Sequence, residues 1–327
     1  MKVKHQLIKR LNLSKVLWPF LNNGLYCFNF HRIGSWQDTS FDPCVFSCDA
    51  ENFEKYLFFI KNNFRVVSLD EVNDIAEKNI PMKEPLALIT FDDGYSDNYH
   101  IAFPLLKSSG LPATFFITTN LINSNLIPWW DEISWHIRQL ADKTIKLTPW
   151  LHALTIDKTP SRQNIRNVLQ QIKKNPSLIE NQLDELRALT SKNISHNETK
   201  SIFLTWQQIA EMVKCNMTIG AHSHTHRVFS CLTETELNFE LKESKRLIEL
   251  NLSNIVNSLS YPVGNSTTYN KSMYGAISSN GYKLAFSFNA LINKNLNENR
   301  FEIGRFPIDR PFNERIFKEM ILSAKSK

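Results

Sequence analysis

Two adjacent acidic residues, Asp92 and Asp93, come directly after the apolar run of residues 86–91. This run predicts a buried strand, so both carboxylates would lie where a strand leaves the core. Two like charges held together are costly unless a positive group lies between or beside them. A metal ion, a basic side chain or water alone could meet that need.

Three of the nine histidines, His222, His224 and His226, fall within five residues just after a short apolar segment. On a turn or the first turn of a helix, His222 and His226 can point to one side, while His224 should point away. Two imidazoles and one carboxylate of the acidic pair would hold a divalent metal with a position open for water, as in catalytic sites. The other aspartate could then act as a base. A chance cluster on a solvated loop is the alternative.

Strand-like and helix-like segments alternate on both sides of these motifs. Thr233 and Glu236 form a capping box for a helix running to about residue 251. Strands that alternate with helices pair in parallel, so the order predicts an α/β fold, and about seven or eight such units favour a barrel over an open sheet. Strands are predicted at residues 25–30, 86–91, 113–118, 217–220, 258–264, 284–289 and 301–307, and further helices at residues 51–63 and 97–110.

Between about residues 133 and 200 the pattern changes to polar segments of helical period with few strand signals. We therefore predict a helical insertion, 133–200, that rises from the α/β body. The predicted organisation is a basic N-terminal helix over residues 1–22 and a barrel over residues 23–327 that carries the insertion.

The composition excludes several classes of protein. A chain of 327 residues with 42% hydrophobic residues can bury a large core and is not disordered. Its net charge of +6 is mildly basic, without the dense basic patch of a nucleic-acid binder, so we expect no nucleic-acid partner. The five cysteines form no disulfide framework and are expected to be free thiols in a reducing compartment.

The N-terminal segment, residues 1–21, is basic, and charged residues interrupt its apolar positions. It is not the continuous core of a signal peptide, and no apolar run reaches the roughly 20 residues of a transmembrane helix. Two interpretations stay open: a helix docked on its own domain, or an interfacial helix on an anionic membrane. We therefore expect a cytoplasmic protein, with peripheral contact with the inner membrane face through residues 1–21 as the alternative.

The segments TFDDGYSDN (90–98) and GAHSHTH (220–226) resemble the two metal-site motifs of the polysaccharide deacetylases, the NodB-homology family. The segment LLKSSGLPATFFITT between them also matches the family pattern. This resemblance implies a distorted (β/α) barrel of about seven strands that removes acetyl groups from sugars with a divalent metal, most often Zn²⁺. It also implies that Asp92 is the catalytic base and that Asp93, His222 and His226 hold the metal.

Three further segments, residues 28–34, 66–72 and 127–135, look like the branch of the family found in surface-polysaccharide synthesis. The substrate implied is an N-acetylated glycan or a lipid-linked sugar. Trp129, Trp130 and Asp131 could bind it, because aromatic faces stack on sugar rings and an acid binds hydroxyls. Tryptophans packed under the insertion are the alternative.

The chain departs from the family at its third motif, which YPVG at 261–264 resembles. Ser260 stands where the family has an arginine, and Val263 where it has an aromatic residue. Tyr261 and Pro262 remain as substrate-binding candidates. Arg305, near the last predicted strand, could replace the missing arginine, or it could be a surface arginine.

The late histidine that serves the family as general acid is also missing, because no histidine follows His226. His31, at the end of the first predicted strand, could take this role, since a closed barrel brings its first and last strands together. A histidine merely hydrogen-bonded at the strand end is the alternative.

These residues predict a metal-dependent hydrolase that removes an N-acetyl or other acyl group from a sugar of a polysaccharide or its lipid-linked precursor. Two alternatives stay open. One is a catalytically weak carbohydrate-binding or assembly component of a polysaccharide synthesis complex. The other is an O-acetyl esterase or a deformylase, which would use the same site.

Overall fold

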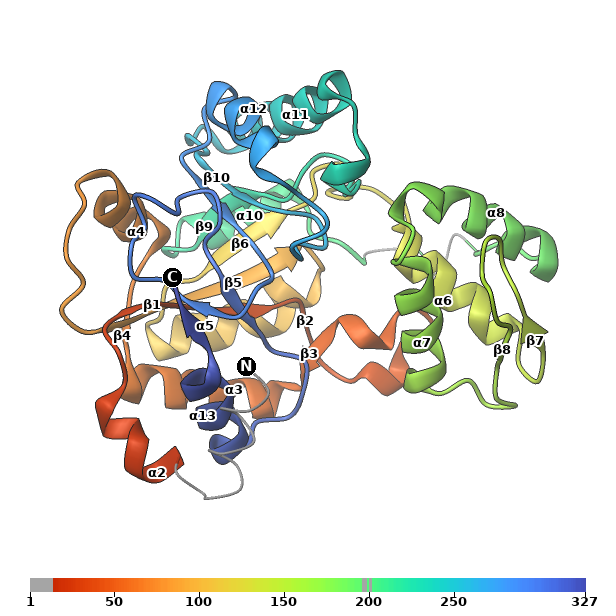
Figure 1. Cartoon of the computed structure of the whole chain (residues 1–327), viewed down its shortest axis with the longest axis horizontal. Helices are drawn as coiled ribbons and strands as arrows, with labels where there is room; N and C mark the ends of the chain where they lie inside the picture. The colour runs from red at the N-terminus through yellow and green to blue at the C-terminus, as the bar shows by residue number, and fades with distance from the viewer. Residues whose placement is uncertain (1–13, 196–198, 200–201) are drawn as a thin grey trace.

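The centre of the molecule is a nearly closed barrel of seven parallel strands, in the order β11-β10-β9-β6-β5-β1-β13 (Figure 1). A computed structural model of the chain describes residues 14–195, 199 and 202–327. A parallel bridge between Phe286 of β11 and Ile303, two residues before β13, links the two ends of the strand order. The predicted barrel is thus confirmed. Its strands are Gly24–Phe30 (β1), Pro85–Asp93 (β5), Thr114–Ile117 (β6), Thr218–Ala221 (β9), Ser258–Ser260 (β10), Leu284–Phe286 (β11) and Arg305–Pro307 (β13).

The central strands are continuous apolar runs because both of their faces are covered. Every residue of β1 is buried, as is every residue of β5 after Pro85. Such runs are typical of parallel strands between a core and an outer layer of helices. The helices around the barrel are Ala50–Asn63 (α3), Leu69–Glu77 (α4), Phe103–Ser109 (α5), Trp206–Val213 (α10), Glu234–Leu252 (α11), Tyr274–Ser279 (α12) and Glu314–Ser323 (α13).

Local signals in the sequence set the ends of several helices. Thr233 and Glu236 form the predicted capping box at the start of α11. Gly110 ends α5 with φ 66°, a left-handed conformation that glycine adopts without strain. The turn before α5, Asn98–Ala102, is a π-helix that the sequence pattern did not predict.

The insertion forms a separate group of helices beside the barrel (Figure 1). It contains Trp129–Gln139 (α6), Arg162–Ile172 (α7) and Ile179–Thr190 (α8), and a short antiparallel hairpin of Thr144–Ile145 (β7) and Leu154–Thr155 (β8). Its apolar side chains form a hydrophobic cluster distinct from that of the barrel. Helix α6 begins four residues before the predicted boundary at 133, and the hairpin was not predicted.

The chain between Ser14 and Phe20 packs against the barrel helices. Its short helix Ser14–Leu17 (α2) leads to Trp18, whose indole N–H donates to Asn63 Oδ1 at 2.7 Å. This supports docking for residues 14–20, while residues 1–13 of the predicted membrane-contacting segment lie outside the described residues. No described helix has the length and apolarity needed to span a bilayer. The small strands are Arg32–Ile33 (β2), Phe46–Cys48 (β3), Arg65–Val66 (β4), Leu291–Ile292 (β12) and Lys325–Ser326 (β14).

Candidate active site

The two predicted motifs meet at the carboxyl ends of neighbouring barrel strands. Asp92 and Asp93 end β5, and His222 follows β9 directly. Strand β6 lies between β5 and β9, and all three are parallel. Their carboxyl ends therefore share one rim, which is where barrels of this kind carry their active sites.

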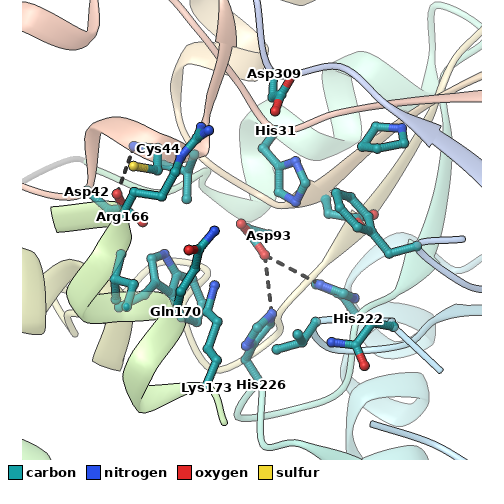
Figure 2. A pocket seen from close by; sticks show the side chains of 18 of the residues that line it. His31, Asp42, Cys44, Asp93, Arg166, Gln170, Lys173, His222, His226 and Asp309 are labelled. Carbon is teal, nitrogen blue, oxygen red and sulfur yellow. Dashed lines mark hydrogen bonds and ion pairs between the residues drawn. The ribbon is translucent and has the colours of Figure 1, made fainter. Parts of the chain in front are cut away.

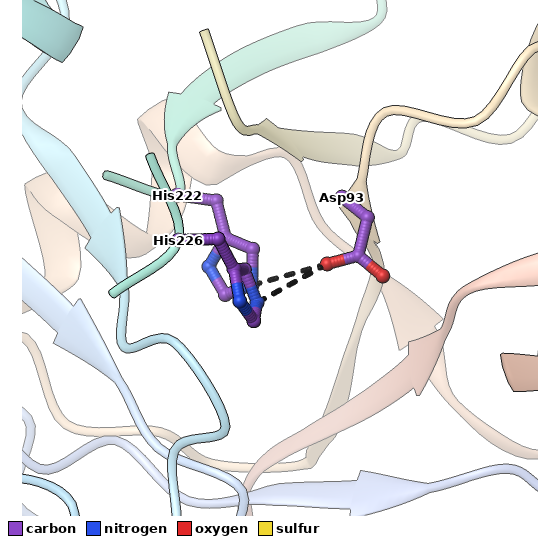
Figure 3. A group of neighbouring side chains, drawn as sticks. All are labelled: Asp93, His222 and His226. Atoms are coloured by element: carbon purple, nitrogen blue, oxygen red, sulfur yellow. Dashed lines mark ion pairs between the residues drawn. The ribbon is translucent and has the colours of Figure 1, made fainter. Parts of the chain in front are cut away.

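Asp93, His222 and His226 converge on one point (Figure 3). Asp93 Oδ1 lies 3.4 Å from His222 Nε2 and 3.5 Å from His226 Nε2. All three side chains are buried, and their ligand atoms lie within 4.8 Å of one another. These N···O distances exceed those of ordinary hydrogen bonds, so the three groups approach one another without bonding directly.

The backbone at this site adopts unusual conformations. Asp93 has φ 76°, Ser223 φ 64° and His226 φ 59°, all in the left-handed region that non-glycine residues seldom occupy. His226 therefore lies on a folded loop. Of the two settings that the sequence left open, a turn or the first turn of a helix, the structure excludes the helix. His224 points away as predicted, with its Nδ1 2.9 Å from Thr119 Oγ1.

The donor set fits a divalent metal. His222 Nδ1 lies 2.9 Å from the carbonyl oxygen of Ser260, which can only accept, so the proton is on Nδ1 and the Nε2 lone pair faces Asp93. Burial, together with His222, lowers the pKa of His226 to about 3 and keeps this ring neutral. The neighbouring carboxylates, Asp92 first, raise the pKa of His222 against the effect of burial, so a metal would compete with a proton there.

Asp92 makes a buried, bidentate ion pair with Arg305. Arg305 Nη1 lies 2.8 Å from Asp92 Oδ1, and Nη2 lies 2.7 Å from Oδ2. Burial alone would raise the pKa of the Asp92 carboxyl, but the Arg305 guanidinium and His222 hold this pKa below its ordinary value. Asp92 is therefore ionised at neutral pH.

Arg305 is fully buried, so the alternative of a surface arginine is excluded. Its Nη2 donates to Ser260 Oγ at 2.8 Å, its Nη1 to Asn29 Oδ1 at 2.7 Å, and its Nε to the Ser287 carbonyl at 3.1 Å. A small residue at position 260 leaves room for a guanidinium that arrives from β13. The structure thus brings Arg305 to the acidic pair, as the hypothesis of a replacement arginine requires.

The family model for polysaccharide deacetylases matches residues 79–285, which is more than half of the chain. The chain belongs to the polysaccharide deacetylase family. Within that range lie both metal-site motifs and the insertion, whereas Asn29, His31 and Arg305 lie outside it.

Individual relatives agree with this assignment. The YxkH protein of Bacillus subtilis (strain 168), named for the same family, is 22% identical over 235 residues, which are 72% of this chain and 56% of that protein. The poly-β-1,6-N-acetyl-D-glucosamine N-deacetylase of Escherichia coli (strain K12) is 26% identical over 104 residues, 32% of this chain and 15% of that protein. The chain thus spans about half or less of these curated relatives. Streptococcus pyogenes deacetylase PplD, solved with acetate, shares the fold with a TM-score of 0.59 and 17% identity over 91% of this chain and 98% of that one.

This deacetylase-family site opens into a cavity of about 370 Å³ (Figure 2). His31 lines the cavity, and its ring packs edge-on against Phe288 with 5.8 Å between centroids. Burial lowers the pKa of His31 despite the nearby carboxylates. The predicted general acid therefore lines the same cavity as Asp92 and Asp93.

The predicted substrate-binding residues divide into two groups. Trp129, Trp130 and Tyr261 line the cavity. The Trp130 ring lies 4.3 Å from that of His226 and its N–H donates to Tyr95 Oη at 2.7 Å, so it also packs against a candidate metal ligand. The Tyr261 hydroxyl is turned into the core, where it donates to the Phe301 carbonyl at 2.9 Å.

Pro262 and Asp131 are not part of the cavity lining. Asp131 is fully buried, and its two oxygens accept from the Tyr95 hydroxyl at 2.8 Å and from the Asp42 N–H at 2.9 Å. The structure therefore gives Asp131 a structural environment and does not place it where a sugar hydroxyl could reach it.

Sequence reasoning missed two parts of this site. Asn29 donates to Asp92 Oδ2 at 3.2 Å while it accepts from Arg305. It is the one amide side chain in the buried strand β1, which is a signal that could have been found. Helix α7 supplies Arg166, Gln170 and Lys173 to the cavity. Their spacing of four and three residues is a signal that could have been found, because it places them on one helical face.

Proposed function

We propose that this chain is a metal-dependent hydrolase that removes an N-acetyl group from a sugar of a polysaccharide or of its lipid-linked precursor. One observation carries the proposal: a buried Asp92, paired with Arg305, lines one cavity together with the convergent Asp93, His222 and His226. A divalent metal held by these three residues, zinc by the nature of the ligands, would act as a Lewis acid on the acyl carbonyl and lower the pKa of water.

Asp92 is the general base in this mechanism. It takes a proton from the attacking water, and Arg305 and Asn29 fix the carboxylate in place for this transfer. Since the ion pair keeps Asp92 ionised, the base is in its active form at neutral pH.

Attack by water places a negative charge on the former carbonyl oxygen, the oxyanion, which needs a hydrogen-bond donor. The leaving amine needs a proton. The Val263 N–H forms no hydrogen bond within the described part of the chain, whereas the Tyr261 N–H bonds the Phe286 carbonyl. Val263 lines the cavity, so we assign its N–H to the oxyanion. Because the pKa of His31 is lowered, we assign its ring to pass on to the departing amine the proton that Asp92 took from the water, and the products are acetate and an amino sugar.

The alternative of a carbohydrate-binding component rested on two departures, the missing third-motif arginine at Ser260 and the missing late histidine. Arg305 contacts Asp92 from β13, so the first departure no longer argues for an inactive site. An O-acetyl esterase or a deformylase would use the same residues, and no observation favours either.

Acetate release from N-acetylglucosamine oligomers by the full chain tests the proposal. We expect release that a chelator abolishes and added Zn²⁺ restores, with one equivalent of metal in the active protein. Release that persists in fully chelated protein would overturn the metal-dependent mechanism. Metal-loaded protein that releases acetate from no N-acetylated sugar would overturn the deacetylase assignment.

A further inference from the structure

One face of helix α7 forms a wall of the active-site cavity (Figure 2). Arg166, Gln170 and Lys173 line the cavity together with the residues of the metal set. The other side of α7 carries Ile165 and Val168, which are fully buried in the core of the insertion. Packing of the insertion therefore fixes the direction in which this wall faces.

The two cations of this wall make no close ion pair within the described part of the chain, although Lys173 is near enough to Asp42 to lower the pKa of that carboxyl against the effect of burial. Neither Arg166 nor Lys173 forms an ion pair with any described residue, although the guanidinium of Arg166 contacts the Cys44 thiol. Arg187 on the neighbouring helix α8 differs, because its guanidinium binds three carboxylates, those of Glu132, Glu180 and Asp184, at 2.6 to 2.8 Å.

Lys173 also lies near an aromatic face. Its Nζ is 5.5 Å from the centroid of the Trp129 ring, which lines the same cavity. An ammonium beside an aromatic ring suits a sugar that stacks on the ring and carries a negative substituent at its edge.

The negative groups of the cavity are already compensated. Asp92 is paired with Arg305, and Asp93 belongs to the metal set. Asp42 is buried, which raises its pKa, and its Oδ1 accepts the Cys44 N–H at 2.7 Å. Asp309 lies 2.8 Å from the Arg310 guanidinium. Two of the four lining acids, Asp92 and Asp309, are thus paired with arginines outside the α7 wall, and Asp93 would be paired with a bound metal. The charge of Arg166 on the α7 wall is then left for a ligand.

We propose that the α7 wall recognises an anionic group of the glycan, a phosphate or a carboxylate, next to the sugar that loses its acyl group. Arg166 can bind such a group with two parallel hydrogen bonds, Lys173 acts as a point charge, and Gln170 between them can bind a hydroxyl. The inference rests on the proposed function only in that both use one cavity. A sugar phosphate would supply the phosphate, and a uronic acid would supply the carboxylate.

Binding measurements on the full chain test the inference. The probes are N-acetylglucosamine, N-acetylglucosamine 1-phosphate and a disaccharide of N-acetylglucosamine and glucuronic acid, titrated by calorimetry. We expect at least one anionic probe to bind about tenfold or more tightly than the neutral sugar, since hydrogen bonds to charged groups are the stronger kind. The Arg166→Gln/Lys173→Gln variant should lose this preference. Lys174→Gln is the matched control, because Lys174 is exposed and bonds Gln171 Oε1 at 2.6 Å.

The preferred anionic probe distinguishes a phosphate from a carboxylate. Equal binding of all three probes, or a preference that survives in the double variant, would overturn the inference. Acetate release from neutral oligomers by the unmodified chain tests the proposed function separately. Release without an anion preference would overturn the inference alone, and an anion preference without release from any probe would overturn the proposed function alone.

Discussion

The barrel and the insertion differ in how their charged side chains are buried and paired. In the barrel, Asp92 and Arg305 are buried and each polar atom of the pair faces a partner. In the insertion, the charges are mostly at the surface, and the two cations on the cavity wall make no close ion pair among the described residues. The difference agrees with our two proposals, that the barrel rim holds the reacting groups and that the insertion presents groups to the substrate.

The physical reason lies in burial. A buried charge is tolerated only when it is paired and hydrogen-bonded, so the barrel can hold a carboxylate in one defined position. A cation that is accessible to solvent can stay unpaired at little cost in free energy. Arg166 and Lys173 on α7 can therefore remain available for an anionic ligand. Substitutions of charged or metal-site residues in the barrel, compared with a matched substitution in the insertion, test this view.

The largest effect should come from the metal set. His226→Ala removes one of three donors, so we expect roughly a 10³-fold or greater loss of acetate release, since a metal's stabilisation of the transition state is worth several kcal/mol. Metal content is measured on the same samples and should fall. His224→Ala is the control, because His224 belongs to the same loop and points away from the site. Equal losses in both variants would contradict the assigned ligand set.

The second effect concerns the base. Asp92→Asn should lower kcat about 10²- to 10⁴-fold, the range typical of a general base, while the protein still binds its metal. Steady-state kinetics and metal analysis of one preparation check this. An active Asp92→Asn protein that has lost its metal would reverse the roles of Asp92 and Asp93.

The third effect is on stability. Arg305→Met leaves Asp92 buried without its partner, and we expect the free energy of unfolding to fall by about 3–5 kcal/mol. The double variant Asp92→Asn/Arg305→Met should be more stable than Arg305→Met alone, because no unpaired charge remains. Denaturant titrations measure both. Additive losses in the double variant would show that the pair is not coupled.

The smallest effect should come from Arg187, the arginine of the insertion that we compare with Arg305 of the barrel. Arg187→Met removes three ion pairs, but the Arg187 side chain is 40% exposed, so we expect a loss of about 1 kcal/mol or less. Acetate release should stay unchanged, since Arg187 does not line the cavity. A loss as large as that of Arg305→Met would remove the contrast between the two regions.

The local parts of this protein could be predicted from the sequence alone. Continuous apolar runs predicted β1 and β5, and a Thr-x-x-Glu pattern predicted the start of α11. The metal set was predictable too, because His222 and His226 are close in sequence and the acidic pair ends a strand. Such patterns record which positions are buried and how the chain turns within a few residues.

The tertiary structure alone decided which distant residues meet. Arg305 reaches Asp92 across 213 positions because closure of the barrel brings β13 beside β1, next to β5. The packing of α7 against the core of the insertion likewise turned Arg166 and Lys173 toward the metal set. Strand order and the packing of the insertion core against the barrel depend on the whole chain, so no local periodicity predicts them. They determine that Arg305 binds Asp92 and that α7 lines the cavity.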